Sequence, residues 1–338
     1  MAEDATERKT DVRAGQVLEV NGLTVEFGAR HGRAPVRAVD RATFTVGPGE
    51  TLGLVGQSGS GKTTTGRAVL QLQKSTAGSV KLLGRDLTGM RGGELRAMRR
   101  HMQFVQQNPY SSLHPRRTVE QIIAEPLEVH RTVPPQDRRA RVAELLEMVN
   151  LEPKVMSRYP HEFSGGQRQR IVIARALAVH PDFVVCDEAV SALDVRTQAQ
   201  IVRLLHDLQE KLGLSYLFIA HDLAIVRDVA HRVAVMYSGQ IVELGPSALV
   251  YARPGHSYTR TLLDAVPVPD PVRQRERLRH PPPDHLPADS RPGPCVFGDD
   301  HEKTGTEPMH EIAPGHRISC RFLPDDFEPT TALRANHE

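Results

Sequence analysis

A glycine-rich segment, GQSGSGKT (residues 56–63), constrains the fold of this chain more than any other feature. It follows a short apolar run, TLGLV (51–55), whose composition is typical of a buried strand. A helix-like segment, TTTGRAVLQL (63–72), comes after it. The pattern G-x-x-x-x-G-K-[ST] between a strand and a helix is that of a phosphate-binding loop. The sequence therefore predicts an α/β domain in which this loop surrounds phosphate groups.

The residue types of the loop fit that chemistry. Gly56, Gly59 and Gly61 permit backbone conformations that a side chain would forbid, so amide groups can point inward around phosphate oxygens. The helix that follows adds its positive N-terminal end. Lys62 is expected to contact the β- and γ-phosphates, and the hydroxyl of Thr63 to bind Mg²⁺. The other loop residues predicted to line a nucleotide are Gln57, Ser58, Ser60 and Thr64.

Two acidic residues, Asp187 and Glu188, end another apolar run, FVVCDE (183–188). Successive residues of a strand face opposite sides, so the two carboxylates can have different roles. We predict that Asp187 belongs to the shell of the Mg²⁺ ion and that Glu188 faces an attacking water as general base. The alternative, two solvated acids at a strand end, loses weight because the phosphate-binding loop is on the same chain.

A histidine, His221, follows the next apolar run, SYLFIA (215–220). In a doubly wound sheet the carboxyl ends of the strands meet in one crevice. That geometry predicts His221 near Glu188 and Lys62, within reach of the γ-phosphate. A lone histidine in this position would more often cap a helix or belong to the core.

Residue composition and hydrophobic pattern divide the chain into three parts. We expect a disordered leader over 1–15 and an α/β domain over 16–252, with strands such as 17–27 and 41–46 and a helical insertion at about 91–160. The extension, 253–338, is rich in proline and charge and is expected to be irregular. Amphipathic helices are indicated by apolar residues at i, i+3, i+4 and i+7: Val142, Leu145, Leu146 and Val149, then Ile201, Leu204, Leu205 and Leu208.

Composition excludes several classes. The net charge is +2, so charge alone implies neither nucleic acid nor an anionic membrane as a partner. Aromatic residues make up 4% and tryptophan is absent, which disfavours stacking platforms for single-stranded nucleic acid. No apolar run approaches about 18 residues, so no membrane span is predicted. The segment 1–15 is polar and lacks the apolar stretch of a secretory signal, so none is expected there. Three cysteines, Cys186, Cys295 and Cys320, make no disulfide framework and fit a reducing cytosol.

A second glycine-containing segment, FSGGQRQR (163–170), precedes a helix-like pattern. Backbone amides at a helix N-terminus form an anion site. The helix has a predicted buried face made of Ile171, Ala174, Leu177 and Ala178. On these residues alone, a glycine-containing helix start with no ligand is an equally good interpretation.

Together these segments resemble the ATP-binding subunits of ABC transporters, over about residues 17–265. FSGGQ is similar to the family's signature sequence, with Phe163 in place of leucine. Gln107, in FVQQNPYSSLHPR, matches the Q-loop glutamine, and SALD (191–194) matches the D-loop. His221 matches the switch histidine, and Phe27 stands where the family places an aromatic side chain against adenine.

The resemblance implies a P-loop NTPase fold with a mainly parallel RecA-like core, an antiparallel β-subdomain and a helical subdomain. It implies ATP as substrate, with Mg²⁺ bound by Thr63, Gln107 and Asp187. Catalytic roles would fall to Glu188, His221 and Gln107. It also implies a head-to-tail dimer in which one subunit contacts ATP held mainly by the other, through Ser164, Gly165, Gly166, Gln167 and Asp194.

A narrower resemblance is to the ATPases of oligopeptide/dipeptide importers. It is carried by NPYSSLHPRRTV, PHEFSGGQRQRI, CDEAVSALDV and HSYTRTLLDAVP. It implies a second, unlike ATPase subunit, two transmembrane permease subunits and, indirectly, an extracytoplasmic solute-binding protein, with no nucleic-acid partner. The chain would then lie peripherally on the cytoplasmic face of the cell membrane. Ala189 and Asn108 replace the branch's usual proline and aspartate, but neither removes a catalytic group, so an active ATPase is expected.

The tail departs further from this branch, whose extension often carries four cysteines, in some members around an iron–sulfur cluster. Here Cys295 and Cys320 remain, and His301 and His310 could complete a Cys₂His₂ zinc site. The preferred interpretation is a tail with two leftover cysteines and surface histidines, without metal.

Other functions stay open or lose weight on specific features. The same ATPase could serve another solute, such as nickel or a sugar, because the cargo is chosen by other subunits. A soluble ABC ATPase acting on nucleic acid is disfavoured, since no heptad run or zinc insertion separates Lys62 from Ser164. A single phosphate-binding loop disfavours a two-cassette translation protein, and a P-loop kinase would leave the signature without a role.

Overall fold

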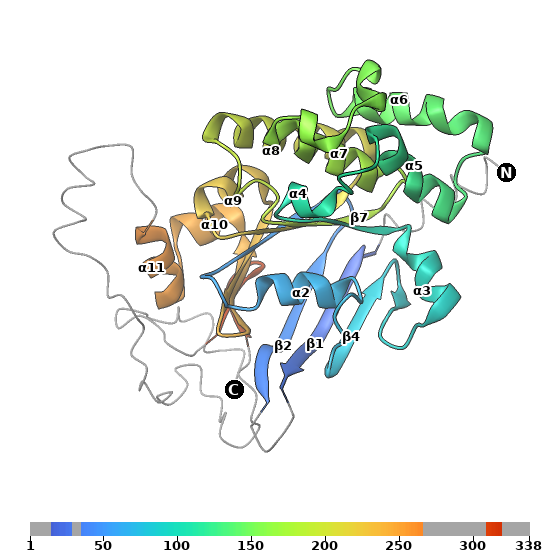
Figure 1. Ribbon diagram of the computed structural model, residues 1–338. Helices are drawn as coiled ribbons and strands as arrows, with labels where there is room; N and C mark the ends of the chain where they lie inside the picture. The colour runs from blue at the N-terminus through green and yellow to red at the C-terminus, as the bar shows by residue number, and fades with distance from the viewer. Residues whose placement is uncertain (1–14, 29–34, 266–308, 320–338) are drawn as a thin grey trace. The chain divides into compact units, whose positions relative to one another are not determined.

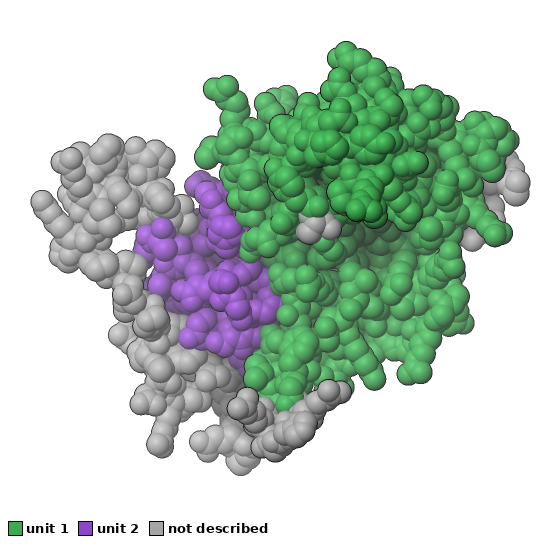
Figure 2. Space-filling model, viewed as in Figure 1, with its two compact units in different colours: residues 1–51, 63–219 green, residues 52–62, 220–338 purple. Residues whose placement is uncertain are grey.

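The computed structural model describes residues 15–28, 35–265 and 309–319, and the statements below concern these residues. The chain forms two compact units, which Figure 2 shows in different colours. The first unit comprises residues 1–51 and 63–219, and the second comprises 52–62 and 220–338. The chain therefore passes from the second unit to the first between Lys62 and Thr63, inside the phosphate-binding loop.

The first unit contains an antiparallel sheet in the order β2-β1-β4-β5 (Figure 1). Its strands are β1 (Leu18–Phe27), β2 (Val36–Val46), β4 (Ala77–Leu82) and β5 (Arg85–Asp86). Leu18, Val20 and Leu23 of β1 are fully buried, which explains the apolar face that predicted this strand. The second strand predicted from alternation, 41–46, begins earlier, at Val36.

Three parallel strands also belong to this unit: β6 (Met102–Val105), β7 (Phe183–Asp187) and β8 (Ser215–Ala220). β7 pairs with β6 on one side and with β8 on the other. Every residue of β7 and β8 is buried, as expected of parallel strands covered on both faces, so both appear in the sequence as continuous apolar runs. β6 lies within the range predicted to be helical; with four residues, it is too short to show a period.

The helices of the first unit are α2 (Lys62–Val69), α3 (Gly92–Arg99), α4 (Pro109–Ser112), α5 (Val119–His130), α6 (Arg138–Met148), α7 (Gly165–Leu177) and α8 (Val195–Leu212). Short 3₁₀ turns are η1 (Pro135–Asp137), η2 (Pro153–Ser157) and η3 (Pro160–Glu162). α5, α6 and α7 pack against one another, as Figure 1 shows. The predicted apolar faces are buried, including Val142 and Leu146 on α6 and Leu204 and Leu208 on α8.

The second unit is built on strands in the order β11-β12-β10-β9-β3. β3 (Thr51–Val55) runs parallel to β9 (Arg232–Tyr237), whereas β10 (Gln240–Pro246), β12 (His316–Ser319) and β11 (Met309–Ala313) continue it antiparallel. Its helices are α9 (Leu223–Val229), α10 (Ser247–Ala252) and α11 (Ser257–Asp264). The predicted combination of parallel strands, an antiparallel sheet and a helical region is confirmed.

The extension differs from the irregular segment expected after residue 252. α11 is a helix, and β11 with β12 forms a hairpin that adds two strands beside β10. His316 and Ile318 are buried, so the hairpin has an inward face, but strands of four and five residues were too short to stand out in a polar sequence. Cys295, His301 and Cys320 lie outside the described residues.

Within the described part of the chain, no helix combines the length and the apolar character needed to span a bilayer.

Candidate nucleotide-binding site

The loop between β3 and α2 adopts a backbone that depends on its glycines. Gly56, Gly59 and Gly61 have φ angles of +152°, +81° and +105°, which L side chains rarely adopt. A Cβ atom on Gly56 would also lie 2.1 Å from the carbonyl oxygen of Met236, at the end of β9. The loop therefore needs glycine at its first position both for its angles and for its close packing on β9.

Lys62 lies inside the loop rather than in solvent. Its Nζ donates hydrogen bonds to the carbonyl oxygens of Gly56 and Gln57, each at 2.8 Å, and the residue is 5% exposed. The backbone of Ser60 is held by the amide of Gly239, which donates to its carbonyl oxygen at 2.9 Å. The Ser60 hydroxyl is buried and has no hydrogen-bond partner among the described residues. An ordered loop with a buried ammonium and an orphaned hydroxyl fits an anionic ligand such as a phosphate.

In the first unit, the first turn of α2 meets the end of β7. The hydroxyl of Thr63 donates to Oδ1 of Asp187 at 2.9 Å, and Asp187 is 5% exposed. A hydroxyl beside a buried carboxylate supplies the oxygen ligands that Mg²⁺ prefers. These two predicted metal-site residues are therefore adjacent, and Thr64 follows in the same turn.

Glu188 is held in an unusual backbone conformation. Its φ angle is +47°, in the left-handed region that costs energy for a residue with a side chain. The amide of Glu188 donates to the carbonyl of Ile219 at 2.9 Å, and the carbonyl of Glu188 accepts from the hydroxyl of Ser191 at 3.0 Å. Gln107 Nε2 donates to Glu188 Oε2 at 2.6 Å. The fold thus brings together two residues that the sequence placed in catalysis.

The segment after Gln107 is ordered by a cap. Oδ1 of Asn108 accepts a hydrogen bond from the amide of Tyr110 at 2.9 Å and begins α4. An asparagine serves as an N-cap about as well as an aspartate, so this departure from the importer pattern keeps the local structure.

The signature segment begins α7 with a reciprocal cap. Ser164 Oγ accepts from the amide of Gln167 at 3.3 Å, and Gln167 Oε1 accepts from the amide of Ser164 at 3.0 Å. Phe163, 5% exposed, anchors the segment in the core, whereas Ser164 itself is exposed. The start of α7 is thus firmly held and faces outward.

The signature packs on the first turn of α8 through Gly166. A Cβ atom there would lie 2.4 Å from Cγ2 of Thr197. Thr197 is in turn fixed by Asp194, the N-cap of α8, whose carboxylate accepts from the Thr197 amide at 3.0 Å and hydroxyl at 2.6 Å. Both bonds lower the pKa of Asp194, and the bond from the Thr197 hydroxyl has the larger effect. Asp194, predicted to contact ATP, therefore also orders the start of α8.

Family comparisons agree with this geometry. Residues 39–191 match the family described as ABC transporter, and residues 242–323 match the oligopeptide/dipeptide transporter C-terminal region. The chain belongs to the ABC transporter family. Within that family it has the C-terminal region of the oligopeptide/dipeptide branch.

Curated relatives of this ABC family member include glutathione import ATP-binding proteins named GsiA. The protein from Escherichia coli strain K12 is 54% identical over 274 residues, which is 80% of this chain and 44% of the relative. The protein from Shigella flexneri is 53% identical over 278 residues, 81% of this chain and 45% of the relative. The chain thus spans less than half the length of these curated relatives.

Solved structures share the fold. The ATP-binding cassette MJ0796, solved as a dimer in a post-hydrolysis state bound to ADP and Pi, has a TM-score of 0.62 at 29% identity and covers 68% of this chain and 98% of its own. The cbiO1 protein of Clostridium perfringens, at 24% identity with a TM-score of 0.63, supports the fold alone.

The remaining predicted site residues are Phe27 and His221. Phe27 ends β1 beside Val36 and is 43% exposed, as an aromatic platform needs to be. His221 belongs to the second unit and lies, exposed, between β8 and the Asp222 cap of α9. Its nearness to Glu188 stays a prediction.

The described residues include Cys186 and, in the extension, His310. Burial raises the pKa of Cys186 to about 12, so this thiol stays protonated beside Asp187 and is not a nucleophile. Of the four residues considered for zinc, the described residues include His310 alone, which is 6% exposed on β11.

Sequence reasoning missed Arg168. Its guanidinium lies 3.9 Å from the ring centroid of Tyr110 and donates to the carbonyl of Pro160 at 2.6 Å. This side chain therefore links the signature helix to the segment after Gln107. Arg168 is the first of the two arginines in SGGQRQR, but nothing in the sequence pairs it with Tyr110.

Proposed function

We propose that this chain is the ATP-hydrolysing subunit of a membrane importer for small peptides. The observation that carries the cargo class is the match of residues 242–323 to the oligopeptide/dipeptide transporter C-terminal region. The relatives' names support the same class, because glutathione is a tripeptide. ATP would be the substrate and Mg²⁺ the metal.

The chain's own groups have distinct tasks in this proposal. The loop amides and Lys62 would bind the β- and γ-phosphates, and Thr63 with Asp187 would hold Mg²⁺, whose charge offsets that of the phosphoryl oxygens. Glu188 would accept the proton of the attacking water. Its left-handed backbone and its bond from Gln107 fix the carboxylate before the substrate arrives.

The second half of each site would come from another subunit. Gly165 and Gly166 form the N-terminus of α7 beside the exposed Ser164, and backbone amides at a helix N-terminus make an anion-binding geometry. The family resemblance pairs this segment with the γ-phosphate held by a partner's Lys62 equivalent. ATP then favours the closed dimer, and loss of the γ-phosphate favours opening.

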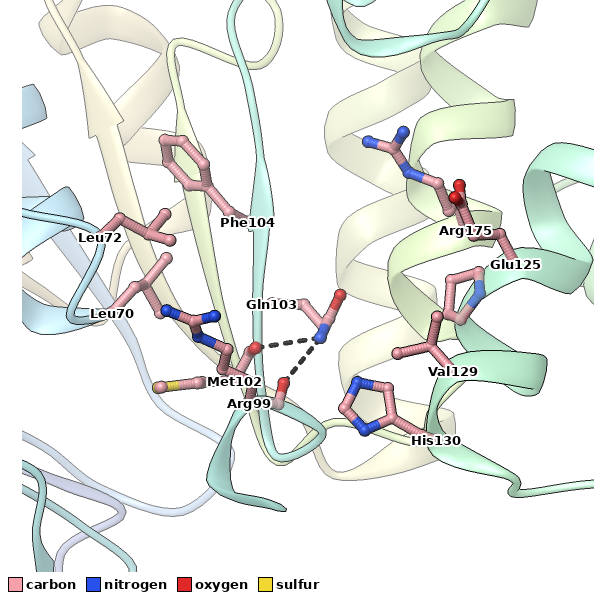
Figure 3. Close-up of a pocket in the computed structure, with 11 residues that line it drawn as sticks. Leu70, Leu72, Arg99, Met102, Gln103, Phe104, Glu125, Val129, His130 and Arg175 are labelled. Atoms are coloured by element: carbon pink, nitrogen blue, oxygen red, sulfur yellow. Dashed lines mark hydrogen bonds between the residues drawn. The ribbon is translucent and has the colours of Figure 1, made fainter. Parts of the chain in front are cut away.

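A pocket in the first unit is our proposed docking place for the permease. It has a volume of about 380 Å³ and lies among residues from the end of α2, α3, β6, α5 and α7, as Figure 3 shows. Leu72 and Val129 on its wall are 53% and 46% exposed, so the wall presents apolar surface to solvent. Phe104 of its wall lies three residues before Gln107, so a segment bound there can move the Q-loop directly.

Leu72→Asp tests this docking. The charge should reduce transport by the assembled importer about tenfold, because it would be desolvated in the interface, while ATP hydrolysis by the isolated chain stays within about twofold of wild type. Leu212→Asp is the matched control, since Leu212 is also an exposed leucine, 36% exposed at the end of α8. Equal transport by the two variants in proteoliposomes would contradict the docking site.

The cargo is tested in the assembled importer. We expect di- or oligopeptides, glutathione among them, to stimulate ATP hydrolysis when presented with the solute-binding protein. Stimulation by nickel or a sugar, with no response to peptides, would transfer the same ATPase role to another solute.

A further inference from the structure

The second unit joins the C-terminal extension to the phosphate-binding loop through one tyrosine. The hydroxyl of Tyr258, on α11, accepts a hydrogen bond from the backbone N–H of Gln57 at 2.9 Å. Tyr258 is 2% exposed, and its ring centroid lies 4.5 Å from that of Tyr237, at the end of β9. The two residues of the bond are 201 positions apart in the chain.

We propose that Tyr258 is a positioning residue for the phosphate-binding loop. This inference rests on the proposed nucleotide binding. The backbone N–H of Gln57 donates to the Tyr258 hydroxyl, and this bond fixes the peptide group between Gly56 and Gln57, where the loop turns. Burial raises the pKa of Tyr258, so its hydroxyl stays neutral and keeps this role across physiological pH.

The start of α11, which carries Tyr258, is held by a buried polar cluster. His256 is the N-cap of α11, and its Nδ1 accepts from the amide of Tyr258 at 3.1 Å. The amides of Gly255 and His256 donate to the two carboxylate oxygens of Glu243, at 2.8 Å and 3.1 Å. Glu243 is fully buried on β10, so this carboxylate sets where α11 begins.

The hairpin of the extension closes on the same carboxylate. Nε2 of His316, on β12, lies 2.7 Å from Oε1 of Glu243, and His316 is 2% exposed. Gly255 permits this packing, because a Cβ atom there would lie 2.8 Å from side-chain atoms of Ile312 and Ile318. A continuous set of contacts therefore runs from β12 through Glu243 and α11 to Gln57, and the extension supports the shape of the loop.

Tyr258→Phe removes the hydroxyl and keeps the ring. With the Gln57 amide left unpaired, we expect the Kd of the full chain for Mg·ADP, measured by calorimetry, to rise about tenfold. The KM for ATP should rise similarly while kcat stays within about twofold, since the loop binds ground state and transition state alike. Tyr251→Phe is the matched control: its hydroxyl donates to the carbonyl of Leu223 in the same unit, away from the loop.

His316→Ala provides a second variant at the far end of the cluster. It should weaken Mg·ADP binding less than Tyr258→Phe, and the double variant should bind no more weakly than Tyr258→Phe alone, because both act through one contact. Amide exchange of residues 52–62 should be faster in Tyr258→Phe than in Tyr251→Phe.

The outcomes separate the two proposals. Wild-type chain that fails to bind Mg·ADP would overturn the proposed function. Wild-type binding together with equal Kd values and exchange rates for Tyr258→Phe and Tyr251→Phe would overturn the positioning role of Tyr258 alone.

Discussion

Replacing Glu188 with glutamine should lower ATP turnover about 100- to 1,000-fold while leaving ATP binding intact. Glutamine has nearly the same shape and can keep the contact with Gln107, but it cannot accept a proton from water. ATP would then remain bound and hold the subunits together. Steady-state hydrolysis and light scattering with Mg·ATP measure the two effects, and we expect a slow enzyme and a lasting dimer.

A matched control separates the base from general charge effects. Glu210→Gln changes an exposed acid on α8 of the same unit and should leave turnover within about twofold of wild type. If Glu188→Gln hydrolyses ATP as fast as Glu210→Gln, the general base is another group.

Gly166→Ala should reduce ATP hydrolysis about 10- to 100-fold without weakening Mg·ADP binding to the phosphate-binding loop. The new Cβ would meet Cγ2 of Thr197 at 2.4 Å, so the start of α7 must shift from its place on the first turn of α8. A displacement of about 1 Å in a catalytic segment is enough for such a loss. Hydrolysis by the assembled dimer and calorimetry with Mg·ADP check the two halves of this prediction.

Thr197→Ser should partly rescue Gly166→Ala, because serine lacks Cγ2 but keeps the hydroxyl that donates a hydrogen bond to Asp194. The double variant should recover part of the lost hydrolysis. Gly93→Ala, on α3, is the control: its Cβ would meet nothing within 4 Å, and alanine favours a helix. Gly166→Ala with full activity, or a double variant no better than the single one, would contradict the packing explanation.

The sequence predicted those features that depend on short segments. The glycine-rich loop, the buried runs of β7 and β8, and the apolar faces of α6 and α8 each follow from local residue type and spacing. β6 and the β11–β12 hairpin were missed because their strands have four or five residues, too few to establish alternation.

Contacts between distant segments could not be predicted in the same way. The bond between Gln107 and Glu188 joins residues 81 positions apart, and Arg168 finds Tyr110 only when α7 packs beside α4. The role of Asp194 as the cap of α8 is local, yet the resemblance directed attention to ATP instead. Tyr258 lies in a motif that marks the importer branch, but its contact with Gln57 is a product of the fold.

The most direct test of the account asks whether the signature of one subunit reaches the nucleotide of another. Vanadate, trapped with Mg·ADP in the assembled importer, stands in for the γ-phosphoryl group, and ultraviolet light then cuts the backbone beside it. We predict cuts both in the loop at 56–63 and in the signature at 164–166, mapped by mass spectrometry. Cuts confined to the loop, in an assembly that hydrolyses ATP, would contradict the shared site.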